Sequence, residues 1–427
     1  MFQTLRNAWK IPDLRKKILY TVFLLVVFRF GSHIPVPWID SAAISTWLDS
    51  ADGNSLFNLL DMFSGGAFSN ATIFAMSISP YINSSIIMQL LTVAIPALER
   101  MSKEGEEGRK KITQITRWLT VVLAALQAFG LYVTLHNQSA INVPAGLPGW
   151  LVALTIVLAF TAGTAFLMWL GEEITGKGIG NGISMLIFAG IVARIPTMAY
   201  SAYNNFSEWY WLVLLLVYAL VSIMFVVLVN SAERRLPVQY AKRVVGRKMY
   251  GGQSSYIPIK VAMAGVIPII FAMSIMSFPG TLAMLFGQSN GGVLMDISNF
   301  ITGGALYPLL YFLLIVGFTY FYTSITFNPV EVSNNIKKNN GAIPGLRPGK
   351  PTSDYIAKVL SRITLAGAIF LAIVAVLPII ISLFTGKALA ELTLSGTSLL
   401  IVVGVALETV KQIESQMLMR HYKGFLE

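Results

Sequence analysis

Residues 54–96 read NSLFNLLDMFSGGAFSNATIFAMSISPYINSSIIMQLLTVAIP, and this stretch decides the fold. It opens with a short apolar piece, residues 55–63, which is soon broken by Gly65 and Gly66. At about 1.5 Å per residue, roughly nine helical residues cover about half of the hydrocarbon thickness of a bilayer. We therefore expect a half-helix buried within protein, with Asn54 or Ser55 as its N-cap and the glycine pair as its turn.

The second apolar run of this stretch, residues 71–90, is long enough to span a bilayer but unusually polar. It contains Pro80, Asn83, Gln89 and four serines. Polar groups in hydrocarbon need protein partners or water, so a helix with this composition is expected to face other protein or a wet cavity. The pattern is typical of a helix that lines a pathway.

The composition is that of a multi-pass membrane protein. The chain has 427 residues, of which 55% are hydrophobic and 12% charged, and its mean hydropathy is +0.68. It has no cysteine, which excludes disulfide and thiolate chemistry. Residues 1–17 carry cations and lead directly into an apolar run without a small-residue cleavage site, so we interpret them as a retained cytoplasmic N-terminus.

Ten apolar runs of spanning length are predicted. They are residues 18–37, 72–95, 113–135, 150–170, 183–199, 209–230, 261–281, 305–327, 360–384 and 396–415. With this register, all but three of the 31 Lys and Arg residues fall on one side of the membrane, and the exceptions are Arg29, Arg194 and Lys387. This asymmetry identifies the basic side as cytoplasmic, with both termini and the tail 416–427 on that side.

Two long loops on the basic side are candidates for interaction surfaces. The first basic loop, residues 231–260, contains two extended runs around a basic turn at 238–250, which predicts a projecting hairpin. The second basic loop, residues 328–359, is rich in glycine and proline over 339–351, which excludes a long helix there. Composition alone favours anchoring to anionic lipid over docking of an acidic partner.

Motifs for catalysis and cofactors are weak. Residues 171–178, GEEITGKG, nearly match the phosphate-binding loop motif. The motif fails because Gly178 stands where a Ser or Thr would bind magnesium, and because a spanning helix rather than a strand precedes it. We therefore interpret these residues as a flexible turn. His33, His136 and His421 are scattered and form no zinc motif. We expect no metal, no cofactor and no enzymatic activity. Within the spans, snorkelling or local pairing accounts for Arg29 and Glu408.

Isoleucine pairs recur at helical spacing. Ile78 and Ile82 share one helix face, as do Ile187 and Ile191. A ring of branched apolar side chains would keep a constriction dry and would not select a cargo by hydrogen bonding. Spacing alone fits ordinary core packing better than a pore.

Several motifs together resemble the SecY/Sec61-alpha family of protein-conducting channels. They are MFSGGA at 62–67, ISPYI at 78–82, GIGNGIS at 178–184, AGVIP at 264–268 and PGLRPG at 344–349. The resemblance runs in order from Trp9 to His421. It implies an all-α fold of ten transmembrane helices in two inverted, pseudo-symmetric halves of five, residues 18–200 and 201–427, with a re-entrant plug half-helix at about 55–67.

The resemblance also implies functional residues. The plug includes Phe57, Leu60, Met62, Phe63, Ser64, Gly65, Gly66 and Ala67. The pore ring comprises Ile78, Ile82, Ile187, Ile191, Ile270 and Ile401. The lateral gate between the second and seventh spans includes Ser85, Gln89, Thr92, Gln127, Ile275 and Phe278. Because Ala262 stands where many members carry Asn, polar gate contacts are expected to rest on Gln127 or Thr92.

The implied function is passage of unfolded secretory polypeptides across the bacterial plasma membrane and release of membrane segments into lipid. The implied partners are the small subunits SecE and SecG, the motor ATPase SecA, the ribosome, signal sequences and anionic lipid. The resemblance assigns both basic loops to SecA and the ribosome, through Lys242, Arg243, Arg247, Lys248 and Arg347. A secondary transporter of a small solute is the alternative, because such proteins also use inverted repeats and broken helices.

Overall fold

The structure is a computed structural model. It describes residues 2–49, 61, 64–143, 146–205, 209–240, 243–245, 248–250, 254–286, 300, 306–385 and 395–423. The chain divides into two compact units. Unit 1 comprises residues 1–207, 273–307 and 405–427, and unit 2 comprises residues 208–272 and 308–404. Each unit is described by itself.

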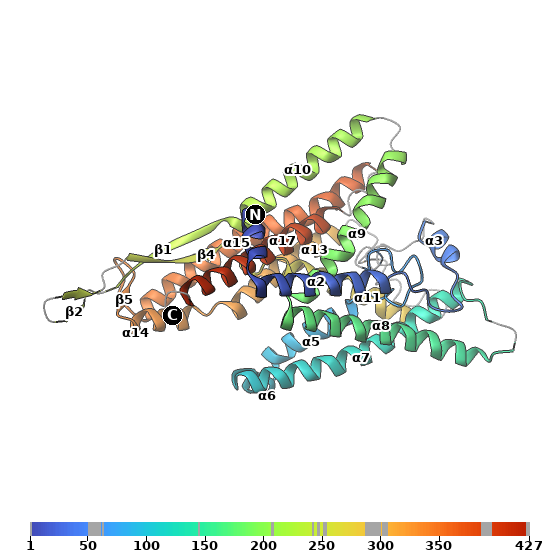
Figure 1. The fold of residues 1–427 in the computed structure, drawn as a ribbon, viewed down its shortest axis with the longest axis horizontal. Coiled ribbons are helices and arrows are strands. Elements are labelled where there is room, and N and C mark those ends of the chain that lie inside the picture. Colours follow the sequence, from blue (N-terminus) through green and yellow to red (C-terminus); the bar gives the residue numbers. More distant parts are fainter. Residues whose placement is uncertain are drawn as a thin grey trace. The chain divides into compact units, whose positions relative to one another are not determined.

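Unit 1 is built from helices (Figure 1). They are α1 (Phe2–Lys10), α2 (Pro12–Gly31), α3 (Ser41–Asp49), α5 (Ser79–Ala94), α6 (Pro96–Lys103), α7 (Glu106–Asn137), α8 (Gly149–Lys177) and α9 (Gly182–Asn205). Helix α7 packs against both α5 and α8, and α8 also packs against α2 and α9. Helices α11 (Ile267–Phe286) and α17 (Ser395–Lys423) contribute residues to both units.

The polar second run does not form one long helix, and that part of the prediction is wrong. Residues 71–78 form turns, in which Ala71 and Ser77 have φ of 51°. Helix α5 begins only at Ser79, with Pro80 in its first turn, where a missing N–H costs nothing. Its 16 residues rise about 24 Å, which is less than the hydrocarbon thickness. Asn83 and Ser84 are buried, as expected for a helix facing protein.

The expected flexible turn at 171–178 is also not observed, because α8 continues through Lys177. Glu173 accepts a hydrogen bond from Lys177 at 3.1 Å, which supports the last helical turn. The chain turns instead at residues 178–181, where Gly180 has φ of +89°.

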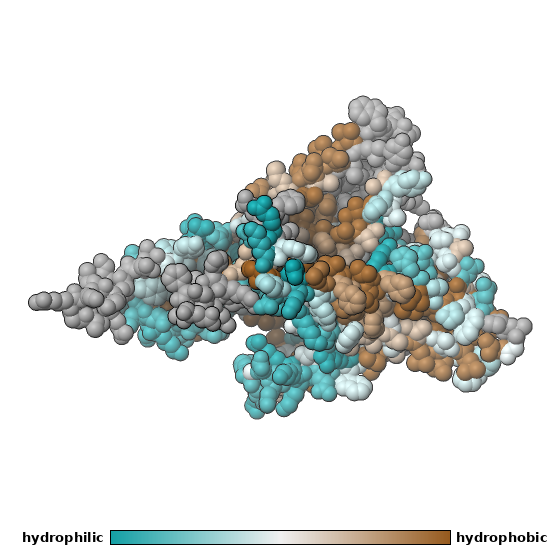
Figure 2. Space-filling view, in the orientation of Figure 1, coloured by the Kyte–Doolittle hydropathy of each residue, from teal (hydrophilic) through white to brown (hydrophobic). Residues whose placement is uncertain are grey.

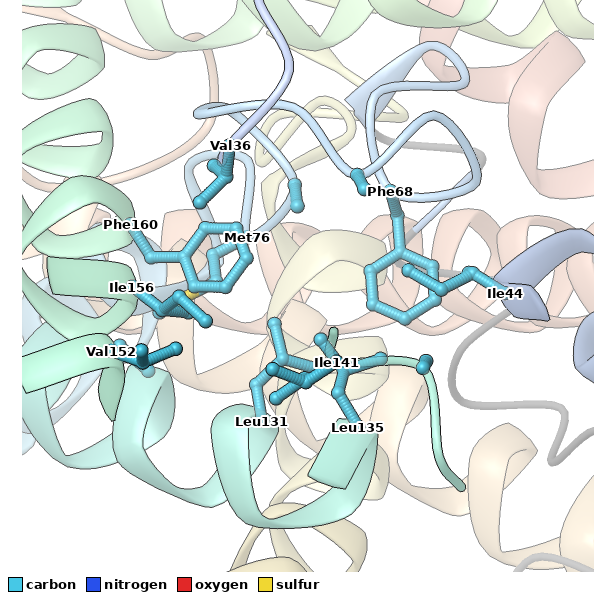
Figure 3. Close-up of a cluster of buried hydrophobic side chains, with 14 of the residues drawn as sticks. Val36, Ile44, Phe68, Met76, Leu131, Leu135, Ile141, Val152, Ile156 and Phe160 are labelled. Carbon is cyan, nitrogen blue, oxygen red and sulfur yellow. The ribbon is translucent and has the colours of Figure 1, made fainter. Parts of the chain in front are cut away.

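A hydrophobic core of unit 1 lies directly beside the turns that follow the predicted plug (Figure 3). Phe68 and Met76 of these turns are buried together with Ile44 of α3. Leu131 of α7 and Phe160 of α8 complete the cluster from the two long helices. Burying large apolar side chains contributes roughly 1.5–3 kcal/mol each, so this cluster holds the turns in place.

Unit 2 combines long helices with a small sheet. Its helices include α10 (Trp209–Ser231), α13 (Leu306–Thr326), α14 (Pro329–Lys338) and α15 (Lys350–Thr385). Strands β1 (Glu233–Tyr240) and β4 (Ser254–Lys260) pair antiparallel, and β5 (Gly341–Ala342) adds to the other edge of β1. Strands β2 (Arg243–Val245) and β3 (Lys248–Tyr250) form an antiparallel pair, which confirms the predicted hairpin.

The described helices are those of a multi-pass membrane protein. Four are long and apolar enough to cross a bilayer: 106–137, 149–177, 306–338 and 350–380. Helices α5 and α6, bent by 100° at their junction, would make a fifth span. Figure 2 shows hydrophobic side chains along α2 in unit 1 and along α10 in unit 2, and many of these are exposed. Each of the ten predicted runs overlaps a helix, and the number of ten spans stays a prediction.

Candidate functional site

The candidate site starts at the C-terminal end of the predicted plug. Asp61, Ser64, Gly65, Gly66 and Ala67 are described, whereas Phe57, Leu60, Met62 and Phe63 lie outside the described residues. The carbonyl of Asp61 accepts hydrogen bonds from the Gly66 N–H and the Ser64 hydroxyl, both at 3.0 Å. These bonds close a compact turn in which Gly65 and Gly66 adopt φ of +68° and +87°.

Two arginines contact this turn from different helices. Arg194 Nη1 of α9 donates to Asp61 Oδ2 at 2.6 Å. Arg29 Nη1 of α2 donates to the Gly65 carbonyl at 3.0 Å, so Arg29 is paired with a segment 36 residues away in sequence. Arg194 belongs to the predicted span 183–199 and was assigned to the side opposite the basic one; it lies within α9 and is paired. Both contacts tie the turn to its surroundings.

The backbone of the turn also touches α9 directly. A Cβ atom added to Gly65 would lie 3.0 Å from both the Cα and the carbonyl oxygen of Gly190. Gly190 is flanked on α9 by Ile187 and Ile191, two members of the predicted pore ring. Because Gly65 has no Cβ, the two backbones can approach this closely; a side chain at Gly65 would press on the backbone of Gly190.

The predicted ring residues are distributed between the units. In unit 1, Ile78, Ile187 and Ile191 are buried and Ile82 is half-buried. Ile78 precedes α5 and its carbonyl accepts the N–H of Ile82 at 3.0 Å, so the two lie one turn apart at the start of that helix. In unit 2, Ile270 and Ile401 are buried. The assignment of all six to one ring stays a prediction.

The predicted gate residues lie on three helices. Ser85, Gln89 and Thr92 share a face of α5, and Gln89 Nε2 lies 3.5 Å from the Ser85 hydroxyl. The Thr92 hydroxyl donates to the Met88 carbonyl of its own helix at 2.7 Å. Gln127 is half-buried on α7, which packs against α5. On α11, Ile275 is half-buried and Phe278 is exposed. A gate between α5 and α11 stays a prediction.

The two basic loops share one sheet, which the sequence did not predict. Gln239 and Tyr240 of β1 pair with Ala342 and Gly341 of β5. A hydrophobic cluster that includes Leu236, Val238, Ile336, Ile343 and Ile356 lies among the same elements. Main-chain pairing and this shared core join β1 and β4 of the first basic loop to the described part of the second.

Arg347 is exposed on the second basic loop, between Gly345 and Gly349, whose φ values are +80° and +107°. The Arg347 carbonyl accepts a hydrogen bond from the Thr352 hydroxyl at 2.8 Å, and the Ser333 hydroxyl donates one to the Gly349 carbonyl at 2.8 Å. These two bonds fix the backbone on either side of Arg347, while the side chain of Arg347 is exposed. Lys242 and Arg247 lie outside the described residues, and Arg243 and Lys248 are located by backbone only, in β2 and β3.

On strand β1, Arg235 Nε donates to Glu233 at 2.8 Å, and this hydrogen bond raises the pKa of Arg235 above its usual value. The guanidinium also lies 4.8 Å from the centre of the Tyr256 ring. Arg235 is therefore engaged within the sheet.

Sequence reasoning missed Asp61 and Arg194 as a pair. Asp61 was treated as part of the apolar half-helix, and Arg194, within the predicted span 183–199, only as an exception to the distribution of cations. Two opposite charges within otherwise apolar runs were the available signal, because an unpaired charge at membrane depth is costly.

Comparison with known proteins decides the family. The family model SecY matches residues 72–410. The chain belongs to the SecY family. It is 45% identical over 437 residues to the protein translocase subunit SecY of Thermotoga maritima, covering 100% of this chain and 98% of the relative. It is 48% identical over 437 residues to the same-named protein of Halalkalibacterium halodurans, with full coverage of both. The SecY family consists of channel subunits without catalytic activity.

The fold agrees with solved SecY and Sec61 structures. A structure described as a protein conducting channel has a TM-score of 0.64 at 17% identity, covering 94% of this chain and 92% of the other. A second, from a study of the SecY plug domain in the closed state, has a TM-score of 0.61 with the same identity and coverage. The SecY fold class, mostly helical and multi-pass, is thereby confirmed, and the family supports the conduit over the secondary transporter.

Proposed function

We propose that this chain is the central subunit of a protein-conducting channel. It passes unfolded secretory polypeptides across the bacterial plasma membrane and releases membrane segments into lipid through a gate between α5 and α11. The observation that carries the proposal is the full-length identity of 45–48% to protein translocase subunits.

In this proposal the six isoleucines form a dry constriction and residues 55–67 form the plug. Branched apolar side chains press against a passing backbone without requiring particular hydrogen bonds, so a chemically varied cargo passes while ions are excluded. The support in unit 1 is the close approach of the Gly65 backbone to Gly190, which is near Ile187 and Ile191 in sequence.

Partners follow from the same assignment. SecE and SecG are the small membrane subunits, and SecA or a ribosome docks on the basic loops and drives or delivers the cargo. A related structure is described as Sec61 in a ribosome-channel complex. Exposed Arg347 on its fixed loop, with exposed Lys337, Lys338 and Lys350 nearby in sequence, supports an acidic partner there. Both termini are cytoplasmic, and the basic side also contacts anionic lipid.

The test is reconstitution into proteoliposomes with SecE and SecG. With SecA and ATP outside, a radiolabelled secretory precursor should become protected from added protease, and protection should be lost when detergent opens the vesicles. Small solutes should show no saturable, gradient-driven uptake. Saturable uptake without precursor protection would support the secondary transporter and contradict the proposal.

A further inference from the structure

The anchoring of the predicted plug depends on two charged side chains from two helices. Arg194 of α9 reaches Asp61, and Arg29 of α2 reaches the Gly65 carbonyl. Arginine at membrane depth is costly unless it is paired with an acid or with backbone carbonyls. Here each guanidinium has such a partner, and in both cases the partner belongs to the same short turn.

Asp61 is the centre of this arrangement. Its Oδ2 accepts Arg194 and its Oδ1 accepts the Ser69 N–H at 2.8 Å, while its carbonyl closes the turn. One residue therefore holds the turn together and also holds it to α9. The partners differ in exposure, because the side chain of Asp61 is 5% exposed and that of Arg194 is 27% exposed.

We propose that the Asp61–Arg194 ion pair, together with the Arg29–Gly65 hydrogen bond, is an ionic latch that holds the plug in the resting channel and breaks when the plug leaves. The inference rests on the proposed function and names the residues that determine how often the plug opens. Arg194 and Arg29 are positioning residues, since they act on ions and cargo through the plug.

The unequal burial predicts unequal effects. R194Q leaves a buried carboxylate without its cation, which destabilises the docked plug, whereas D61N leaves a half-exposed arginine that solvent can reach. The measured quantity is the resting ion conductance of the reconstituted channel in planar bilayers. R194Q should raise it at least about tenfold, D61N by less, and R194K should restore most of the seal.

The double variant tests whether the two residues act as a pair. In D61N/R194Q no charge is left buried, so its conductance should lie below that of R194Q alone. A conductance equal to the product of the two single effects would show that the residues act independently and would overturn the latch. Equal conductance of R194Q and the unmodified channel would also overturn it.

Two controls separate this inference from the proposed function. R117Q breaks the Arg117–Glu172 ion pair between α7 and α8, which is 2.7 Å long and lies away from the plug turn in sequence, and should leave conductance unchanged. A variant with ring isoleucines replaced by glycine should leak. If the ring variant leaks and R194Q does not, the latch is wrong and the channel stands. If neither leaks, the assignment of the channel itself fails.

Discussion

Alanine at Gly65 tests the contact between the predicted plug and α9. With φ of +68°, Gly65 is in the left-handed region, which costs a residue with a Cβ about 1–2 kcal/mol. The added Cβ would also lie 3.0 Å from two backbone atoms of Gly190. Backbone atoms cannot turn aside as a side chain does, so we add a steric cost of about 1–3 kcal/mol, typical of overpacking.

Gly66 provides a matched control in the next position. Its φ of +87° imposes the same backbone cost, but an added Cβ would meet only the side chains of Asn70 and Ser69, at 3.8 and 3.9 Å. The difference between G65A and G66A therefore isolates the contact with Gly190. A difference of about 1–3 kcal/mol corresponds to about 5- to 150-fold in the ratio of displaced to docked plug.

The assay is single-channel recording of the purified channel in planar bilayers without cargo. G65A should open about 5- to 150-fold more often than G66A, while both variants keep the thermal stability of the unmodified protein within a few degrees. Equal opening frequencies for the two variants would refute the reasoning, because the contact with Gly190 would then carry no weight in the resting state.

Three further predictions concern the constriction, the docking loop and the packing of α8. Replacing ring isoleucines with glycine should make the resting channel leak ions, and unchanged conductance in planar bilayers would mean that the constriction lies elsewhere. R347E should abolish SecA-driven translocation into proteoliposomes without unfolding the protein, whereas K110E, an exposed charge reversal on α7 outside both basic loops, should retain most of it. Normal transport by R347E would remove the docking assignment. G163A should lower the thermal unfolding temperature in detergent, because the added Cβ would collide with the Ile73 carbonyl. G176A on the same helix, where an added Cβ has no atom within 4 Å, should leave that temperature unchanged or raise it slightly. Equal shifts for the two variants would contradict the packing described for α8.

Local patterns were sufficient to predict much of the fold. Apolar runs predicted the helices because length and hydropathy are properties of a single segment. The extended runs on either side of the basic turn predicted the β2–β3 hairpin for the same reason. The polar composition around Asn83 and Ser84 correctly indicated a helix with a protein-facing side.

Contacts between distant segments were not predictable in this way. Asp61 and Arg194 are 133 residues apart, and neither neighbourhood specifies the other. The joining of the two basic loops by β1 and β5 is equally remote from any local pattern. The late start of α5 has a similar cause, since the Ala71 carbonyl is held by the Val36 N–H at 2.8 Å and residues 71–78 are fixed as turns before the helix begins.

The central claim is that cargo moves through the interior of this helical protein, past a narrow apolar constriction. The native chain has no cysteine, so a single cysteine at Ile82→Cys and one in a stalled secretory substrate form an unambiguous pair. A second single-cysteine protein, Val26→Cys, carries the thiol on an exposed face of α2. On oxidation, the substrate should form a disulfide with the cysteine at position 82 and not with the one at position 26. A disulfide only with position 26 would place the cargo on the outer surface of the helices and contradict the account.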